Sequence, residues 1–159
     1  MTLKPNSRNP TPLAQLRSFL ARFDPKSQKL IRSVRAALQK RFPTANELAY
    51  DYNHSIVISY SPTDHGIDGI VAISASAKGI FLYFNQGQNL PDPTKLLQGS
   101  GKQTRFVRVD AADQLAQPDM EALMDASMDQ AKVPLPTKGR GILLIRGAAS
   151  KESPRRPRK

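Results

Sequence analysis

The sequence predicts an α+β protein, a two-layer sandwich in which helices pack on one face of a mainly antiparallel sheet of about five to six strands. Three observations predict it. Two helical patterns open the chain, the period of the apolar residues changes from about 3.6 to 2 after Pro43, and strand-like segments follow at hairpin spacing. The length of 159 residues indicates one domain, and the hydrophobic share of 39% is enough to build a core.

The two opening helices follow from apolar spacing and from capping residues. After Thr11, apolar residues recur every three or four positions, which predicts a first helix. Asp24 then supplies an N-cap and Pro25 a first-turn proline for a second helix, which Pro43 ends. The second helix carries basic residues opposite its apolar stripe, and these are Lys26, Lys29, Arg32 and Lys40.

The later elements follow from period-2 segments and from turn residues. The expected strands are 48–52, 55–60, 70–75, 80–85, 104–109 and 142–145. The first four form two hairpins that turn at Asn53-His54 and at Lys78-Gly79, where glycine supplies a positive φ. We expect a helical turn at 93–97 and a third helix over 118–131, and we expect the last strand at an edge of the sheet.

Composition excludes several classes of protein. The absence of Cys rules out disulfide scaffolds, thiol nucleophiles and thiolate metal sites. No apolar run approaches the roughly 20 residues that span a bilayer, and the first thirty residues lack the apolar stretch of a signal peptide. We therefore expect a cytoplasmic protein with no membrane partner.

The charge is strongly positive, with 24 Lys and Arg against 13 Asp and Glu and a net charge of +11. We expect residues 1–10 to be a disordered lead, 11–148 to form the domain and 149–159 to be a disordered basic tail. The tail either serves solubility or binds polyanions such as nucleic acid without sequence preference. Its candidate contacts are Arg155, Arg156, Arg158 and Lys159.

From Phe81 onward the chain reads FLYFNQGQNLPDPTKLLQGSGKQTRFVRVDAADQLAQPDMEALMDAS. The strand into Gly87, Asp92-Pro93, the Gly99–Lys102 segment and the helix from Pro118 make this stretch resemble the YdhG-like family of small bacterial domains. Weaker similarity extends over 12–146. The resemblance implies a frataxin-like sandwich, a fold in which some relatives handle intracellular iron, and it implies no catalytic residues.

The glycine turn in that stretch supplies candidate ligand-binding residues, which are Gly99, Ser100, Gly101, Lys102 and Arg105. A P-loop is excluded, because Leu96 stands where the first glycine is required and Gln103 follows Lys102. The backbone N–H groups of this turn could form a small anion site beside its basic residues. We expect instead an architectural turn in which at least one glycine has a positive φ.

The third helix carries a row of carboxylates four residues apart, Glu121, Asp125 and Asp129. These could bind a cation loosely, and the resemblance suggests iron, but an acidic helix face is more simply solvated. The second helix is basic, and the frataxin-like sandwich that the resemblance implies would place the two helices side by side, so we expect them to screen each other's charge. The residues themselves imply no cofactor.

The aromatic residues on the apolar faces of the expected strands include five that we single out, Tyr50, Tyr52, Tyr60, Phe81 and Tyr83. We expect most of them in the core, with a stacking platform for single-stranded nucleic acid as the alternative. His54 and His65 match no metal-binding spacing, and no catalytic constellation is found.

The sequence therefore predicts a non-enzymatic YdhG-like domain that binds a protein partner or a small ligand, with a role in iron or metal handling as the version that the resemblance suggests. The alternative is weak, sequence-independent binding of nucleic acid or another polyanion through the tail and the second helix. Salt separates the two, because only polyanion binding weakens steeply as counterions are released.

Overall fold

The computed structural model describes residues 10–148. Its α-helices are α1 (Pro12–Leu20), α2 (Pro25–Arg41) and α3 (Pro118–Asp129). Its strands are β1 (Asn46–Asp51), β2 (Ser55–Ser61), β3 (Val71–Ser76), β4 (Gly79–Phe84), β5 (Arg105–Arg108) and β6 (Leu143–Ala148). Short 3-10 helices are η1 (Gly66–Asp68), η2 (Gly87–Asn89) and η3 (Ala112–Ala116).

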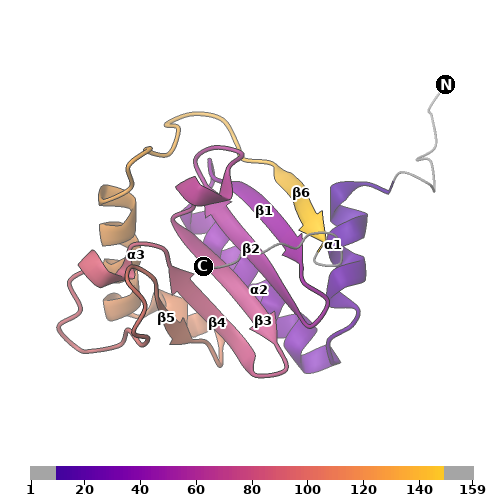
Figure 1. Cartoon of the computed structure of the whole chain (residues 1–159), viewed down its shortest axis with the longest axis horizontal. Coiled ribbons are helices and arrows are strands. Elements are labelled where there is room, and N and C mark those ends of the chain that lie inside the picture. Colours follow the sequence, from indigo (N-terminus) through magenta and orange to yellow (C-terminus); the bar gives the residue numbers. More distant parts are fainter. Residues whose placement is uncertain (1–9, 149–159) are drawn as a thin grey trace.

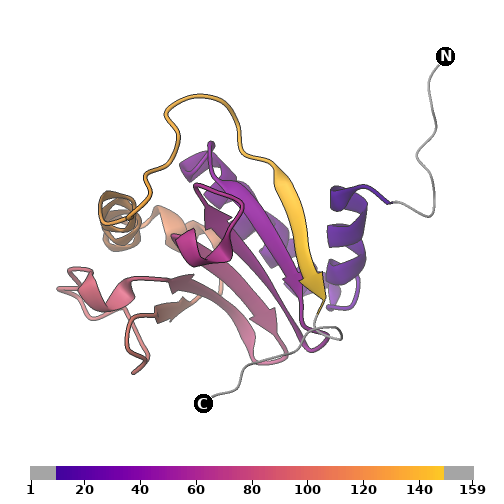
Figure 2. The same ribbon diagram turned by 45° about the horizontal axis from the view of Figure 1, so that its top comes forward.

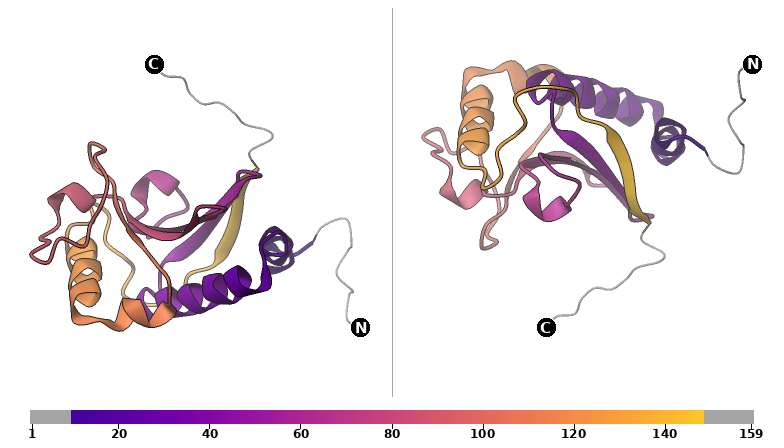
Figure 3. Two further views of the ribbon diagram at one scale, coloured as in Figure 1. Left: turned by 90° about the horizontal axis from the view of Figure 1, so that it is seen from below. Right: turned by 90° about the horizontal axis from the view of Figure 1, so that it is seen from above.

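The strands form one six-stranded sheet in the order β5-β4-β3-β2-β1-β6 (Figure 1). Neighbouring strands are antiparallel except β1 and β6, which run parallel. All three α-helices lie on one side of the sheet (Figure 3). The α+β class, the mainly antiparallel sheet and the edge position of the last strand are confirmed.

One face of the sheet packs against α2 and forms the core. Ile58, Ile73 and Leu82 from three adjacent strands are fully buried there, together with Ile31 and Val34 of α2. Alternate residues of each strand point to this face, so period 2 in the sequence becomes one continuous apolar layer. Burying such side chains contributes roughly 1.5–3 kcal/mol each.

The starts of α1 and α2 are confirmed by their caps. The Thr11 Oγ1 accepts the Ala14 N–H at 3.1 Å, and the Asp24 Oδ1 accepts the Ser27 N–H at 2.9 Å. Hydrogen bonds from the side chain and then the backbone of Ser27 lower the pKa of Asp24. Both caps satisfy N–H groups that the helix leaves free, and the cap at Asp24 is the one that the sequence predicted.

The expected helical turn at 93–97 is wrong. The Asp92 carboxylate accepts the N–H groups of Leu96 and Leu97 at 2.8 and 2.9 Å, and Lys95 has a φ of 57°. Aspartate can fold the following backbone into a local turn that competes with a helix. The sequence also did not predict η1, η2 and η3, because each is too short to show a periodic pattern.

A buried polar network joins α2 to the covered face. Arg35 donates to both carboxylate oxygens of Glu47 at 2.9 Å, Gln39 donates to Oε1 at 3.0 Å, and the Tyr60 hydroxyl donates to Oε2 at 2.6 Å. Burial, followed by the charge of Glu47, raises the pKa of Tyr60 well above its usual value. Burial acts to lower the pKa of Arg35, but the bonds and charge of Glu47 outweigh it, so that pKa is raised.

Candidate functional site

The second face of the sheet is covered over only part of its width. The segment 62–69, which contains η1, lies on the side of the sheet opposite to α2 (Figures 2 and 3). It covers the β1–β2 region, where Leu48 and Ser61 are fully buried. No described helix covers the same face of β3, β4 and β5. We call this area the open half-face; its side chains include Ser74, Phe81, Tyr83, Phe106 and Arg108.

Three half-buried rings form a cluster on the open half-face. The Phe106 ring lies 5.5 Å from that of Phe81, edge-on at 88°, and 5.2 Å from that of Tyr83, tilted at 35°. The Arg108 guanidinium carbon lies 5.5 Å from the centre of the Phe81 ring, within the range of a cation–π contact. The cluster therefore presents aromatic surface and a positive charge together.

These rings correct the expectation that the strand aromatics belong to the core. Of the five aromatic residues that the sequence singled out, Tyr60 alone is buried, at 1% exposure. Tyr50, Phe81 and Tyr83 are half-buried on the opposite face, and Tyr52 is 45% exposed. Strand alternation shows which residues share a face, but it does not show which face the helices cover. Phe106, which completes the cluster, was predicted as a strand residue but not as part of a site.

The glycine turn lies directly against this cluster. Gly99 has a φ of +113°, and a Cβ there would come within 3.2 Å of the Phe106 ring. The Arg105 guanidinium donates to the carbonyl oxygens of Gly101 and Thr104 at 2.6 and 2.9 Å. The predicted positive φ is confirmed, and Arg105 holds the loop from inside rather than reaching outward.

The remaining polar groups of this loop are open to solvent. Ser100, Gly101 and Lys102 are exposed, and their N–H groups make no backbone hydrogen bond within residues 10–148. The structure therefore brings the five predicted ligand residues together beside an aromatic surface. Whether the loop binds an anion stays a prediction.

Cations stand at both ends of β5, and we call them the basic rim: Lys78, Lys102, Arg105 and Arg108. Arg108 donates to the Lys78 carbonyl at 3.0 Å and lies 3.3 Å from the exposed Asp110 carboxylate. The other three have no carboxylate partner among the described residues. Arg105 and Arg108 are three residues apart on one strand, which separates their Cα atoms by about 10 Å.

The predicted carboxylate row lies elsewhere, beside the end of α2. Arg41 pairs with both Glu121 and Asp125, so the expected proximity of the basic and acidic helices is confirmed through one arginine. Asp129 is exposed. Between residues 10 and 148, no three His, Asp or Glu side chains gather in a way that could hold a metal ion.

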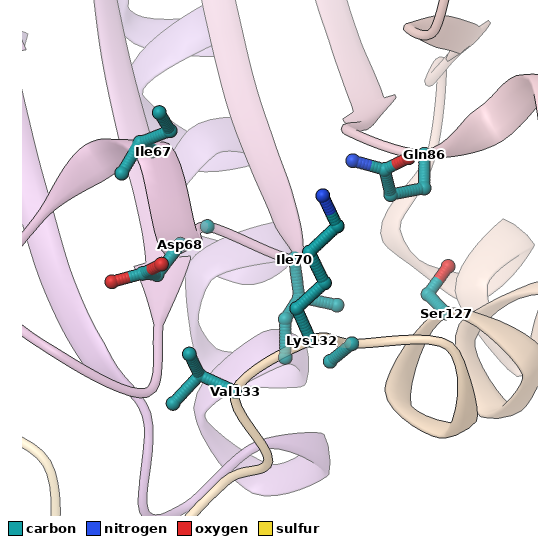
Figure 4. Close-up of a pocket in the computed structure, with 9 residues that line it drawn as sticks. Ile67, Asp68, Ile70, Gln86, Ser127, Lys132 and Val133 are labelled. Carbon is teal, nitrogen blue, oxygen red and sulfur yellow. The ribbon is translucent and has the colours of Figure 1, made fainter.

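Two of the hollows that lie outside the open half-face border predicted site residues or the end of α3. A groove of about 390 Å³ separates α2, η3 and α3, with Lys40 and Arg41 at its side and Leu115 and Met124 among its apolar lining. A cavity of about 50 Å³ lies between η1, the end of β4 and the end of α3, lined by Asp68, Gln86, Ser127 and Lys132 among others (Figure 4). The cavity has room for only a few water-sized groups.

Some of the other predicted basic contacts lie among the described residues. Lys26, Lys29, Arg32 and Lys40 are exposed on α2, whereas Arg155, Arg156, Arg158 and Lys159 lie outside the described residues. Among the described helices none is long and apolar enough to cross a membrane. Comparison of the chain with family models, with curated proteins and with solved structures finds no match.

Proposed function

We propose that the protein is a non-enzymatic binding domain that holds nucleic acid by its phosphate backbone, without sequence preference, at the basic rim. The observation that carries this proposal is the set of cations at both ends of β5, of which Lys78, Lys102 and Arg108 are exposed, next to a loop whose exposed residues 100–102 make no backbone N–H hydrogen bond among the described residues. Cations and free backbone N–H groups are the donors that proteins use toward phosphates.

The distribution of ion pairs favours the basic rim as the binding surface over those cations of the helical layer that already have a carboxylate partner. Among the cations of the helical layer, Arg22, Arg35 and Arg41 each have a carboxylate partner, at Asp51, Glu47 and Glu121 respectively. The net charge of +11 adds a long-range attraction for any polyanion. The exposed lysines of α2 and the tail assist this attraction in our proposal, while the rim supplies the defined contacts.

Kinship with the YdhG-like family and a frataxin-like form of the sandwich are also proposals. The resemblance of residues 81–127 supports both, as does the placement of three helices on one side of the sheet. The version in which the protein handles iron has less support, because Glu121 and Asp125 are both already paired with Arg41.

Binding of a small organic anion is the second candidate function, and the groove between α2, η3 and α3 favours it. A volume of about 390 Å³ suits a small ligand, and the Arg41 Nε is buried with no hydrogen-bond partner. A buried donor without an acceptor is costly, and a ligand oxygen would relieve that cost. Lys40 supplies a second positive charge beside it.

A salt titration tests the proposed function. The affinity of the protein for a fluorescent oligothymidylate of about twelve nucleotides is measured by anisotropy as salt increases. Replacing Lys78, Lys102 and Arg108 together with Gln should flatten the salt dependence by about 0.7 per lost phosphate contact. The matched control replaces Lys26, Lys29 and Arg32 of α2 with Gln, which removes the same charge from the opposite side.

The two triple variants give distinguishable results. The rim variant should lose both affinity and salt slope, and the α2 variant should lose much less of each. Equal losses would show that only net charge matters, and absence of any salt-dependent binding by the wild type would overturn the proposed function.

A further inference from the structure

The three rings of the open half-face are held in fixed positions before any ligand arrives. Phe106 contacts both Phe81 and Tyr83, with ring centres 5.5 and 5.2 Å away, and Gly99 lies against its outer edge. All three belong to paired strands of the sheet, β4 and β5. Side chains that are already ordered lose little conformational entropy on binding, so such a surface is suited to a planar partner.

The covered face uses its aromatic residues differently. Tyr60 and Phe84 are buried on that face at 1% and 0% exposure, and there they fill the space between sheet and helices. On the open half-face no described helix packs over the rings; only the loop at Gly99 contacts Phe106, and each ring remains half-exposed. Adjacent exposed rings on a protein surface mark a binding area more often than isolated ones do.

The chemistry around the rings selects the class of ligand. Arg108 lies over Phe81, and Lys102 stands in the loop beside Phe106. A ligand that matches both features must carry negative charges and flat apolar surfaces at short intervals. Nucleic acid has this composition, because each phosphate is followed by a base that can stack on an aromatic ring.

Only unpaired nucleotides can use these rings. In a duplex the bases are stacked on one another, whereas in a single strand their faces are free. Sheets that bind single strands present aromatic side chains on which two or three bases stack. The rings here occupy β4 and β5 between Lys78 and Arg108 at one end of β5 and Lys102 beyond the other, so bases could lie on the rings while phosphates lie at these cations. Arg105 pairs with Phe84 on the covered face and takes no part in this surface.

We infer that the open half-face binds single-stranded nucleic acid by stacking two or three unpaired bases on Phe81, Tyr83 and Phe106. This inference rests on the proposed function and names its ligand class. It goes beyond backbone binding, because stacking distinguishes single strands from duplexes and from polyanions that lack bases.

The experiment compares three probes: an oligothymidylate of about twelve nucleotides, a duplex of the same length, and inorganic polyphosphate as a competitor without bases. The variant replaces Phe81 and Tyr83 with Leu, which keeps apolar bulk but removes the rings. The control is Phe19→Leu on α1, because Phe19 is also half-buried and also lies under an arginine, with Arg22 at 5.8 Å.

Stacking predicts that the ring variant loses about tenfold or more in affinity for the single strand, since each stacked base contributes on the order of 1–3 kcal/mol. Its affinity for polyphosphate should change less than about twofold, and Phe19→Leu should change neither. If the double variant fails to fold, the single variant Tyr83→Leu takes its place in the experiment. Its loss of affinity for the single strand should be about half as large on a logarithmic scale. The wild type must also bind the single strand more tightly than the duplex.

Other outcomes would overturn the inference in separate ways. One such outcome is that the wild type and the ring variant both bind single strand, duplex and polyphosphate with equal affinity. That result would be consistent with binding to the phosphate backbone and would contradict base stacking on the rings. Failure of the wild type to bind any of the three probes would remove the proposed function itself. A wild-type dimer that the ring variant dissociates would assign the rings to self-association and overturn the inference.

Discussion

Both faces of the sheet carry aromatic side chains, but these side chains are buried on one face and half-exposed on the other. On the covered face, Tyr60 is fully buried and its hydroxyl is bound to Glu47. On the open half-face, Phe81 and Tyr83 of the neighbouring hairpin remain half-exposed, and Arg108 lies over the Phe81 ring. The difference separates stability from function: the covered face holds the fold together, and the open half-face is available to a ligand.

Adjacent residues of β4 should show the largest difference between the faces. Leu82→Ala removes a fully buried side chain and should lower the free energy of unfolding by about 2–5 kcal/mol. Tyr83→Leu, one residue further on the open half-face, should lower it by less than about 1 kcal/mol. Urea unfolding monitored by circular dichroism measures both. Equal losses of stability in the two variants would contradict the distinction between the covered face and the open half-face.

Loss of the buried charge pair should come next in size. Glu47→Gln leaves the Arg35 guanidinium without its counter-charge in a largely buried position, so it should destabilise the protein by about 3 kcal/mol. The control is Asp51→Asn, which breaks the more exposed pair with Arg22 and should cost about 0–1 kcal/mol. A Glu47→Gln protein as stable as the wild type would show that the network is not structural.

The glycine turn should respond to substitution at one position only. Gly99→Ala places a Cβ at a φ of +113° and 3.2 Å from the Phe106 ring, which should cost about 1–2 kcal/mol. Gly101→Ala is the control, because its Cβ would meet only the Thr104 carbonyl at 3.8 Å. Thermal unfolding of the two variants should differ by several degrees, and identical transitions would exclude the proposed packing of the loop on the ring.

Alkaline pH should lower the free energy of unfolding through Tyr60 on the covered face, and this is the smallest of the effects that we expect. The pKa of Tyr60 is raised by burial above its unfolded value of 10.0, so its contribution to stability is complete below about pH 10 and is lost as pH rises above it. Tyr60→Phe should cost about 1 kcal/mol at neutral pH and should reduce this alkaline decline. Tyr83→Phe should leave the decline unchanged, which urea unfolding between neutral and alkaline pH would show.

Much of the fold could be predicted from the sequence, because capping residues and periodicity act locally. Asp24 and Pro25 mark the start of α2, and Gly79 has the positive φ that its turn requires, +129°. The parallel pairing of β6 with β1 could not be predicted, since it depends on a contact between segments almost a hundred residues apart.

The candidate site was predictable only in part for a related reason. The positive φ at Gly99 follows from the local sequence, but its contact with Phe106 depends on how the loop folds back. The open half-face depends on which side of the sheet the helices take, and alternation is the same for both sides. The pairing of Arg41 with Glu121 likewise required two distant helices to meet.

The most direct test of the central claim is to locate the nucleic-acid contact on the wild-type protein by NMR. On addition of a short oligothymidylate, the ring signals of Phe81, Tyr83 and Phe106 and the N–H signal of Lys102 should shift together and saturate at one dissociation constant. Signals of the exposed basic residues of α2 should move little. Shifts confined to α2, with the three rings unmoved, would contradict the assignment of the open half-face as the binding surface.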